Sequence, residues 1–217
     1  AKQTLIQSIF ILPSSCFFHK FIQSIKTMKN LFEHINKYVA VTEKEFEEIS
    51  SYFTQRHVAK KETLYNAGDK GLHHYHVLEG CIHMYFIDAK GAENTLQFAL
   101  KDWWLTDYLA FQKKQVSEFY IEAVEPSMIL EISAKDQEGL FKAHPVMESY
   151  FRNIYQIAYG ASLIKIKYIY KYSKEEMYYR FRDAYPHFVN NAPQYMVATF
   201  LGLSPEYVSK LRKKSVS

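Results

Sequence analysis

Residues 194–214, QYMVATFLGLSPEYVSKLRKK, decide the fold of the C-terminal part of this 217-residue chain. Two helices that meet at a sharp angle need a small residue where their backbones approach and a glycine in the turn. Ala198 and Gly202 supply these two residues. The apolar positions that would hold the helices together are Val197, Leu201, Leu203, Val208 and Leu211. The pattern predicts a helix-turn-helix with its turn at Gly202.

The second helix of this motif has a polar and basic outward face. Ser204 suits its N-cap, and Pro205 suits its first turn. Hydrogen-bonding and phosphate-binding side chains on one face are what a major-groove reader needs. The DNA-binding residues that we predict are Gln194, Ser204, Glu206, Tyr207, Ser209, Lys210, Arg212, Lys213 and Lys214. The alternative is a surface helical hairpin whose basic end only complements the helix dipole.

The composition indicates a globular chain of one or two domains, of which we favour two. Hydrophobic residues make up 48% of the sequence, and the net charge of +4 is modest. The chain as a whole is therefore not basic enough to bind nucleic acid through its net charge alone. Its basic residues are concentrated near residue 212. Cys16 and Cys81 are too few for a disulfide framework, which favours a cytoplasmic location. We expect no cofactor, no metal and no catalytic residue.

Residues 1–27 are rich in Ile and Phe and contain no acidic residue. Pro13, His19 and Lys20 interrupt the apolar run well short of the roughly 20 residues that a membrane span needs. We therefore expect no membrane partner. Met28 opens a sequence of ordinary amphipathic character, and we hypothesise that it is the natural start and that residues 1–27 are an extension.

Hydrophobic periodicity divides the chain between residues 30 and 144. Apolar residues recur at helical spacing over residues 30–53, where Thr42 and Glu45 resemble a capping box, so two short helices are expected. After Lys60 the period changes to two. The expected strands are residues 62–66, 73–78, 82–88, 93–100, 119–124 and 127–132. Several short strands between turn residues predict an antiparallel sandwich or barrel.

A long helix is expected from Pro145 to about Tyr172. Its apolar heptad positions are Met147, Tyr150, Ile154, Ile157, Ala161, Ile164 and Tyr168. This pattern predicts a short coiled-coil seam that joins two copies of the chain, although packing of the same face on the β domain is an alternative. Ser173 and Glu176 resemble a second capping box, which marks the expected domain boundary.

This order of elements over residues 30–214 resembles the cAMP receptor protein/FNR family of bacterial transcription regulators. The strongest support is the helix-turn-helix and the run of strands over residues 64–100. The fold class that the resemblance implies is α+β. It comprises an N-terminal antiparallel β-roll of the double-stranded β-helix, cyclic-nucleotide-binding-like type, a long dimerisation helix and a C-terminal all-α helix-turn-helix domain. The corresponding domains are residues 28–144, 145–172 and 173–217.

The resemblance also implies what the protein would do. It would be a cytoplasmic, non-enzymatic regulator that binds double-stranded DNA as a homodimer at a near-palindromic operator. A small-molecule effector and RNA polymerase are further candidate partners. In the family's E-x-x-S-R pattern of the recognition helix, Glu206, Ser209 and Lys210 take the corresponding places. Lys lacks the rigid fork with which Arg reads guanine, so the resemblance does not define the operator sequence.

The expected effector pocket departs from the family pattern. In cyclic-nucleotide-binding members a Glu meets the ribose and an Arg-Ser pair meets the phosphate. Asp107 stands in place of the Glu, and Ser117 and Glu118 stand in place of Arg-Ser. The predicted pocket residues are Asp107, Tyr108, Ser117 and Glu118. A phosphate without the Arg and close to Glu118 loses its charge-assisted pairing, so we predict an effector other than cAMP.

Two alternatives use the same β domain differently. A metal cupin is the enzymatic one, because His74 and His76 alternate on one strand and could both point into a barrel, with Glu79 following. The spacing to Glu79 is shorter than in that family, and no second half supplies another histidine. The other alternative is an adaptor that uses its long helix for protein partners. Cys81 is expected to be a small buried residue rather than a redox sensor.

Overall fold

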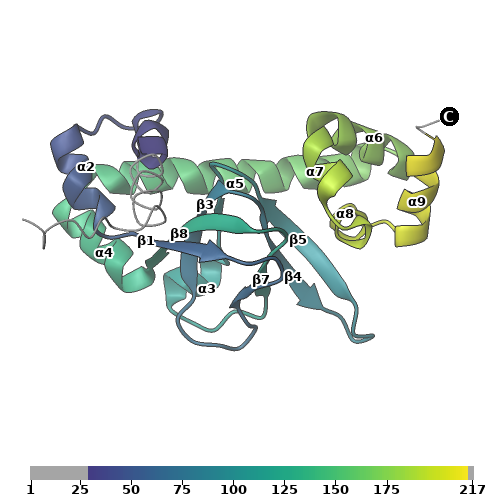
Figure 1. Cartoon of the computed structure of the whole chain (residues 1–217), viewed down its shortest axis with the longest axis horizontal. Coiled ribbons are helices and arrows are strands. Elements are labelled where there is room, and N and C mark those ends of the chain that lie inside the picture. The colour runs from purple at the N-terminus through teal and green to yellow at the C-terminus, as the bar shows by residue number, and fades with distance from the viewer. Residues whose placement is uncertain (1–28, 215–217) are drawn as a thin grey trace, which may run out of the picture.

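The structure is a computed structural model that describes residues 29–214. Two short helices lie at one end, a β-roll in the middle and the C-terminal helices at the other end, and the long helix α5 (Val146–Lys171) runs along all three (Figure 1). The hypothesis that Met28 is the natural start concerns residues outside the described ones. None of the helices within residues 29–214 has the length and apolar character that crossing a bilayer requires.

Two helices precede the sheets, as the sequence predicts. The first covers residues 29–36 and the second, α2, covers Glu43–Ser50. The capping box before α2 is confirmed, because Glu45 N donates to Thr42 Oγ1 at 3.3 Å and Thr42 N donates to Glu45 Oε2 at 2.8 Å. Each side chain thereby satisfies a backbone N–H that the first helical turn leaves unpaired.

Eight strands form the β-roll. They are β1 (Thr54–Val58), β2 (Thr63–Tyr65), β3 (His73–Glu79), β4 (Ile82–Ile87), β5 (Glu93–Ala99), β6 (Trp104–Leu105), β7 (Tyr120–Ala123) and β8 (Ser127–Ser133). They pair as two four-stranded antiparallel sheets in the orders β1-β8-β3-β6 and β2-β7-β4-β5. All six expected strands are confirmed, with ends shifted by no more than one residue.

Three elements of the β domain escaped the sequence patterns. Strand β1 has one apolar residue, the buried Val58, so its sequence shows no alternation of apolar and polar residues. Strand β6 has two residues, too few to show a period, and α3 (Tyr108–Lys113) is a six-residue helix inside a stretch that reads as a loop. Such elements form because neighbouring strands and helices position them, and local propensity alone would not predict them.

The two faces of the β3 sheet belong to different cores. Between the sheets, the roll interior contains Tyr75, Val77, Ile121 and Ile129. On the outer face, Leu78 and Leu130 pack against the N-terminal helices, α4 (Ala134–Ala143) and the start of α5. The buried residues of α5 are Met147, Tyr150, Phe151 and Ile154. The first half of α5 is therefore part of the β domain's own core.

The C-terminal helices are α6 (Lys174–Ala184), α7 (Pro186–Asn191), α8 (Gln194–Phe200) and α9 (Pro205–Lys214). The second capping box is confirmed, because Glu176 N donates to Ser173 Oγ at 3.3 Å and Ser173 N donates to Glu176 Oε2 at 2.9 Å. These helices pack on strand β5, where Thr95 N donates to Thr199 Oγ1 at 3.2 Å. The domain boundary at Tyr172 remains a prediction.

Candidate nucleic-acid interface and effector pocket

Helices α8 and α9 form the helix-turn-helix that the sequence predicts. Gly202 adopts φ +66°, the left-handed conformation that glycine accepts at little cost, and Leu203 N donates to Ala198 O at 2.8 Å across the turn. Ala198 and all five predicted apolar residues are buried: Val197, Leu201, Leu203, Val208 and Leu211. The motif therefore has a packed interior that sets the angle between its helices.

The start of α9 is held by a side-chain cap. Tyr207 N donates to Ser204 Oγ at 3.2 Å, as expected for Ser204 at the N-cap. Hydrogen bonds from its own backbone N–H and from the Ser204 hydroxyl lower the pKa of the Glu206 carboxyl. Glu206 is exposed and therefore presents a carboxylate at the beginning of α9. Lys210, one turn further along, is also exposed.

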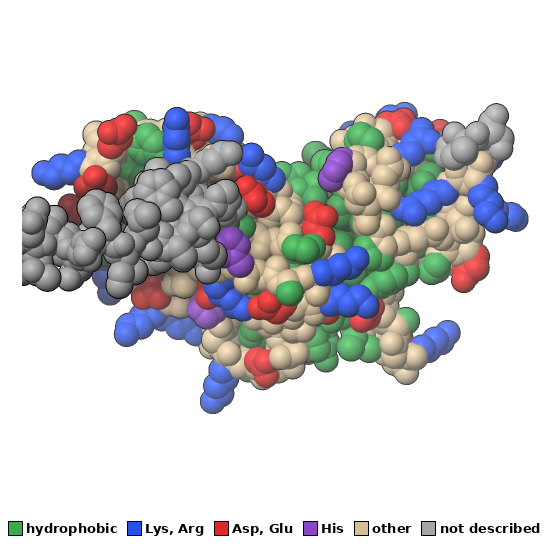
Figure 2. All heavy atoms as spheres, viewed as in Figure 1, with side chains coloured by type: hydrophobic (Ala, Val, Ile, Leu, Met, Phe, Trp, Pro, Cys, Tyr) green, Lys and Arg blue, Asp and Glu red, His purple; other side chains and the backbone are tan. Residues whose placement is uncertain are grey.

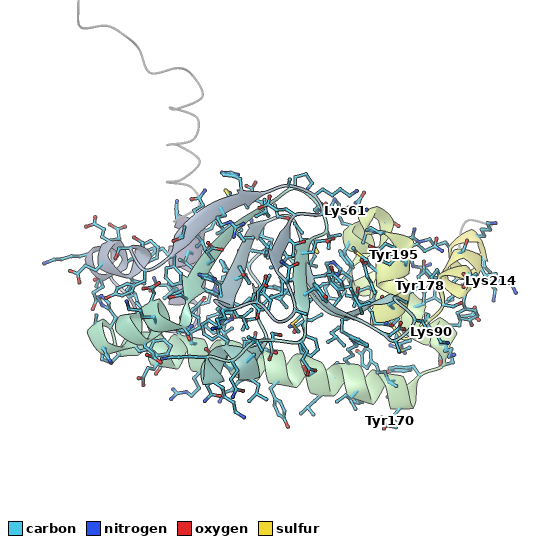
Figure 3. The ribbon with its side chains drawn as sticks, turned by 90° about the horizontal axis from the view of Figure 1, so that it is seen from below. Lys61, Lys90, Tyr170, Tyr178, Tyr195 and Lys214 are labelled. Carbon is cyan, nitrogen blue, oxygen red and sulfur yellow. The ribbon has the colours of Figure 1, made fainter. Side chains whose placement is uncertain are left out.

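Three predicted DNA-binding side chains are engaged inside the C-terminal domain. Gln194 Nε2 donates to Pro205 O at 2.6 Å, which ties the beginning of α8 to the beginning of α9. The half-buried Arg212 donates to Val189 O, and Lys214 Nζ lies 2.8 Å from Glu175 Oε1. Figure 3 places Lys214 at the far end of the molecule. Among the predicted residues, the exposed Ser204, Glu206 and Lys210 lie closest to the turn, whereas Gln194 and Arg212 stabilise the domain.

Two residues of the predicted effector pocket, Asp107 and Ser117, make hydrogen bonds within the chain. Asp107 caps α3, because its Oδ1 accepts from Leu109 N and Ala110 N, each at 3.2 Å. Ser117 Oγ donates to Asp107 Oδ2 at 2.8 Å. The Ser117 N–H donates to the Tyr65 hydroxyl at 3.1 Å. The structure therefore brings Asp107 and Ser117 together, as predicted.

Tyr65 is the residue of this pocket that sequence reasoning missed. It comes just before the turn at Gly68, whose N–H donates to Ser117 O at 2.8 Å, so the turn folds back over the loop. A tyrosine in an alternating strand carries no signal of that contact. Both the hydroxyl and the N–H of Ser117 are paired within the chain, and Ser117 is buried, while Glu118 is exposed. Glu118 is therefore not part of this cluster.

The histidines of β3 do not point into the roll. His74 and His76 alternate on one face as expected, but this is the outer face under α5, and Tyr75 and Val77 occupy the interior. The His74 ring centroid is 4.5 Å from that of Trp104, and desolvation lowers the pKa of His74 to about 3. The cupin geometry is therefore wrong for this chain, because the face that would bind metal in a barrel is apolar.

Other expectations about metal and thiol chemistry concern Glu79 and Cys81. Glu79 is exposed at the end of β3, and residues 29–214 contain no group of three or more His, Cys, Asp or Glu side chains placed to hold a metal. Cys81 is buried, and desolvation raises the pKa of its thiol far above the ordinary value. Its expected role as a small buried residue is confirmed, because a thiol that resists ionisation is a poor redox sensor.

Comparison with known proteins agrees with this geometry. Residues 55–144 match the family model of the cyclic nucleotide-binding domain. No curated protein sequence matches the chain. A solved structure from Eubacterium rectale, assigned to the Crp/Fnr family of transcriptional regulators, has a TM-score of 0.63 at 18% identity, and the match covers 81% of this chain and 84% of that chain.

Two further solved structures have the same architecture. FixK2 from Bradyrhizobium japonicum has a TM-score of 0.59 at 15% identity and covers 75% of this chain and 83% of that chain. The c-di-GMP responsive global regulator CLP of Xanthomonas campestris has a TM-score of 0.57 at 16% identity and covers 78% of this chain and 89% of that chain. At this identity the likeness shows the fold, which is a cyclic nucleotide-binding β-roll, a long helix and a C-terminal helical domain arranged as in Crp/Fnr regulators.

Proposed function

We propose that this chain, whose fold is that of the Crp/Fnr transcription regulators, is a sequence-specific DNA-binding transcription regulator with an effector other than cAMP. The observation that carries the proposal is the exposed side of α9, where Glu206 in the first turn and Lys210 one turn further along project from a helix whose opposite side is packed. A helix held rigidly by its apolar side and polar on its free side can enter the major groove without unfolding its domain.

Glu206 and Lys213 have different roles in this proposal. A carboxylate close to DNA is repelled by the phosphates, so Glu206 needs a compensating donor, and the cytosine N4 amino group in the major groove provides one. Lys213 is exposed near the end of α9. It would meet phosphates, which add affinity without sequence preference. Glu206 would therefore specify the operator and Lys213 would strengthen binding to any DNA.

A homodimer is the expected active form. Ile157 and Ile164 lie at heptad positions of α5 and are 52% and 54% exposed. Apolar side chains at coiled-coil spacing on an exposed face are suited to a second copy of the same helix. Two recognition helices related by a twofold axis would read half-sites about 10 to 11 base pairs apart. RNA polymerase is a further proposed partner.

The hydrogen bond between Ser117 and Asp107 supports an effector other than cAMP. An incoming phosphate would have to displace the Asp107 carboxylate from Ser117 and would find no arginine in the loop. Titration calorimetry should therefore show no cAMP binding at micromolar concentrations. Saturable micromolar binding would show that the Asp107–Ser117 contact opens and would remove this part of the proposal. The Xanthomonas protein with a similar fold is described as responsive to c-di-GMP, which is a nucleotide other than cAMP.

Selection of binding sites from a random DNA library tests the main proposal. The parent should enrich a near-palindromic sequence. Glu206→Ala should relax discrimination at one base pair of each half-site by roughly 1 to 3 kcal/mol. Lys213→Ala should weaken binding to all sequences and lower the slope of affinity against salt by about one unit. Glu47→Ala, which removes an exposed carboxylate from the distant helix α2, is the matched control and should change neither property.

The outcomes separate the proposal from its rival. If no sequence is enriched by the parent, the chain is not a sequence-specific regulator, and an adaptor that binds proteins through α5 becomes the better reading. If Glu206→Ala keeps the base preference of the parent while Lys213→Ala weakens binding, DNA binding stands and Glu206 loses its reading role.

A further inference from the structure

A cavity of about 770 Å³ lies where the β-roll, α5 and the C-terminal helices meet. Its wall is mainly apolar and aromatic, and includes Leu96, Phe98, Trp103, Phe181, Tyr185 and Phe200. On the α5 side it also includes Ile157, Ala161, Ile164 and Tyr168 of the predicted dimer seam. Figure 2 shows hydrophobic side chains gathered in the notch between the β-roll and the C-terminal helices. Of the predicted effector residues, Tyr108 lines this cavity, whereas Asp107 and Ser117 do not. The cavity is therefore distinct from the hydrogen-bonded cluster of Asp107 and Ser117 in the roll.

One wall of the cavity carries a desolvated cation. Lys165 extends from α5, and its Nζ donates to Leu96 O at 2.9 Å and lies 4.0 Å from the centre of the Phe200 ring. Desolvation lowers the pKa of Lys165 to about 8, so the ammonium is still mostly protonated at neutral pH. The carbonyl of Leu96 and the ring of Phe200 carry no charge that could neutralise the ammonium group. Burying an ammonium group is costly unless an anion pairs with it, so this position favours an anionic partner.

The other charged residues of the cavity do not neutralise Lys165. Arg180 stacks on Tyr172, with its guanidinium carbon 4.2 Å from the ring centre. Of the two carboxylates in the cavity wall, Asp183 accepts from Arg182 at 2.7 Å, and Asp102 interacts electrostatically with His34. None of the ion pairs found within residues 29–214 includes Lys165. The cavity thus combines an apolar volume of the size that small molecules occupy with an ammonium group that pairs with no carboxylate among the described residues.

We propose that this cavity binds a small organic carboxylate with an aromatic or branched apolar body, and that the carboxylate pairs with Lys165 Nζ. The apolar body would lie among Phe98, Trp103 and Phe181. Tyr108 lines the same cavity, and its hydroxyl is buried without a hydrogen-bond partner among the described residues.

The position of Lys165 links ligand binding to the DNA-binding helices, a consequence that rests on the proposed function. Lys165 connects three elements, since it belongs to α5, bonds β5 and covers Phe200 of α8. The same α8–β5 contact contains the Thr95–Thr199 hydrogen bond. A carboxylate that draws Lys165 away from Leu96 O and Phe200 would weaken the packing of the first helix of the helix-turn-helix on the roll. The ligand would thereby change how the DNA-binding domain is held.

Intrinsic fluorescence provides a direct test, because the two tryptophans of the chain, Trp103 and Trp104, both line the cavity. The full chain is titrated with 3-phenylpropionate and with its neutral analogue 3-phenylpropanamide. We expect a saturable change in tryptophan emission, with the acid binding at least about tenfold more tightly than the amide, because a desolvated charge pair is worth more than a neutral hydrogen bond.

Variants of Lys165 assign the preference to its charge. Lys165→Met should remove the preference for the acid and leave binding of the amide nearly unchanged, while Lys165→Arg should keep it. Lys167→Met removes an exposed lysine from the same helix and is the control that should behave as the parent. Equal binding of acid and amide by the parent, or no saturable binding of the acid, overturns the proposal. Loss of binding as the protein dimerises would assign the cavity to a second copy and would also overturn it.

A gel-shift experiment distinguishes failure of the carboxylate site from failure of the proposed DNA-binding function. With selected operator DNA, 3-phenylpropionate should alter the affinity of the parent and leave that of Lys165→Met unchanged. Fluorescence binding without a DNA response would keep the carboxylate site and remove its link to α8. A chain that binds the acid but selects no DNA sequence would refute the proposed function and support the site.

Discussion

The first half of α5 is buried against the β-roll, whereas the second half exposes side chains of the same apolar kind. Tyr150 and Phe151 have no exposed surface, but Ile157 and Ile164, further along, are more than half exposed. Nothing in the spacing of apolar residues changes between these halves. The difference teaches that helical periodicity selects a face, while burial of that face depends on which surface happens to lie opposite it.

The second half of α5 also carries apolar residues on its other side. Ile157, Ala161, Ile164 and Tyr168 follow the heptad pattern, while Tyr159, Leu163, Ile166 and Tyr170 form a second row with helical spacing. In Figure 3 Tyr170 points away from the roll. A helix of 26 residues therefore has one buried half and one half with two candidate faces for a partner. Substitutions on the two faces distinguish these surfaces.

The largest expected effect is on assembly. Ile157→Asp would bury an unpaired charge in the predicted seam, which costs roughly 3 to 5 kcal/mol for each copy. Because a symmetric dimer contains the substitution twice, this variant should be monomeric in light scattering. Tyr159→Asp places the same charge on the opposite row and should remain dimeric. If Tyr159→Asp is the monomeric variant, the seam lies on the row that contains Tyr170, and the heptad prediction is wrong.

The next effect is on the stability of the buried half. Phe151 packs against Trp104 and Tyr150, with ring centroids 5.1 Å away in each case. Phe151→Ala leaves a cavity in this core and should lower the free energy of unfolding by about 3 to 5 kcal/mol, measured by chemical denaturation. Leu163→Ala, in the exposed half, should cost well under 1 kcal/mol in the monomeric background of Ile157→Asp. Similar losses for both variants would contradict the contrast between the halves.

The smallest effect is on pH dependence, and it also arises at the buried half of α5. Desolvation lowers the pKa of His74 from 6.5 to about 3 in the folded chain. His74 therefore takes up a proton at a higher pH in the unfolded chain than in the folded one. The stability from neutral His74 is fully present above pH 6.5 and is lost as the pH falls toward 3. Linkage predicts a loss of about 2 kcal/mol at pH 5 relative to pH 8.

Denaturation midpoints measured between pH 8 and pH 5 test this expectation. His74→Phe should make the acid limb of the stability profile shallower, and the remaining slope is expected from His76 and His83, whose pKa values burial also lowers. His57→Gln removes an exposed histidine from β1 and is the control that should keep the profile of the parent. An unchanged acid limb in His74→Phe would show that other groups cause any acid destabilisation.

Much of the fold was predictable because local chemistry and tertiary structure agree. Thr42 with Glu45 and Ser173 with Glu176 form the capping boxes that their spacing indicates, and Gly202 takes the left-handed conformation that the helix-turn-helix requires. In these places the interacting groups are within a few residues of one another. Short-range spacing is then enough to determine the contact.

The candidate sites were only partly predictable for a related reason. Arg212 is basic and lies on α9, which favours a phosphate contact, yet it donates to Val189 on another helix. The face of β3 that carries His74 was also left open, because a period of two gives alternation without telling which face is inside. A one-residue shift of register would exchange the two faces, and only the packing of α5 decides between them.

The order of the elements, their caps and turns, and the helix-turn-helix could be inferred from the sequence, because these depend on side chains close together in the chain. Tertiary structure alone decided that Tyr65 meets Ser117, which is 52 residues away, and that Lys165 meets Leu96, which is 69 residues away. Such contacts arise from the way two sheets and a long helix pack, and no local pattern specifies them. Physically, propensity and periodicity act over one or two turns, whereas the chemistry of a pocket is set by whichever distant side chains packing brings together.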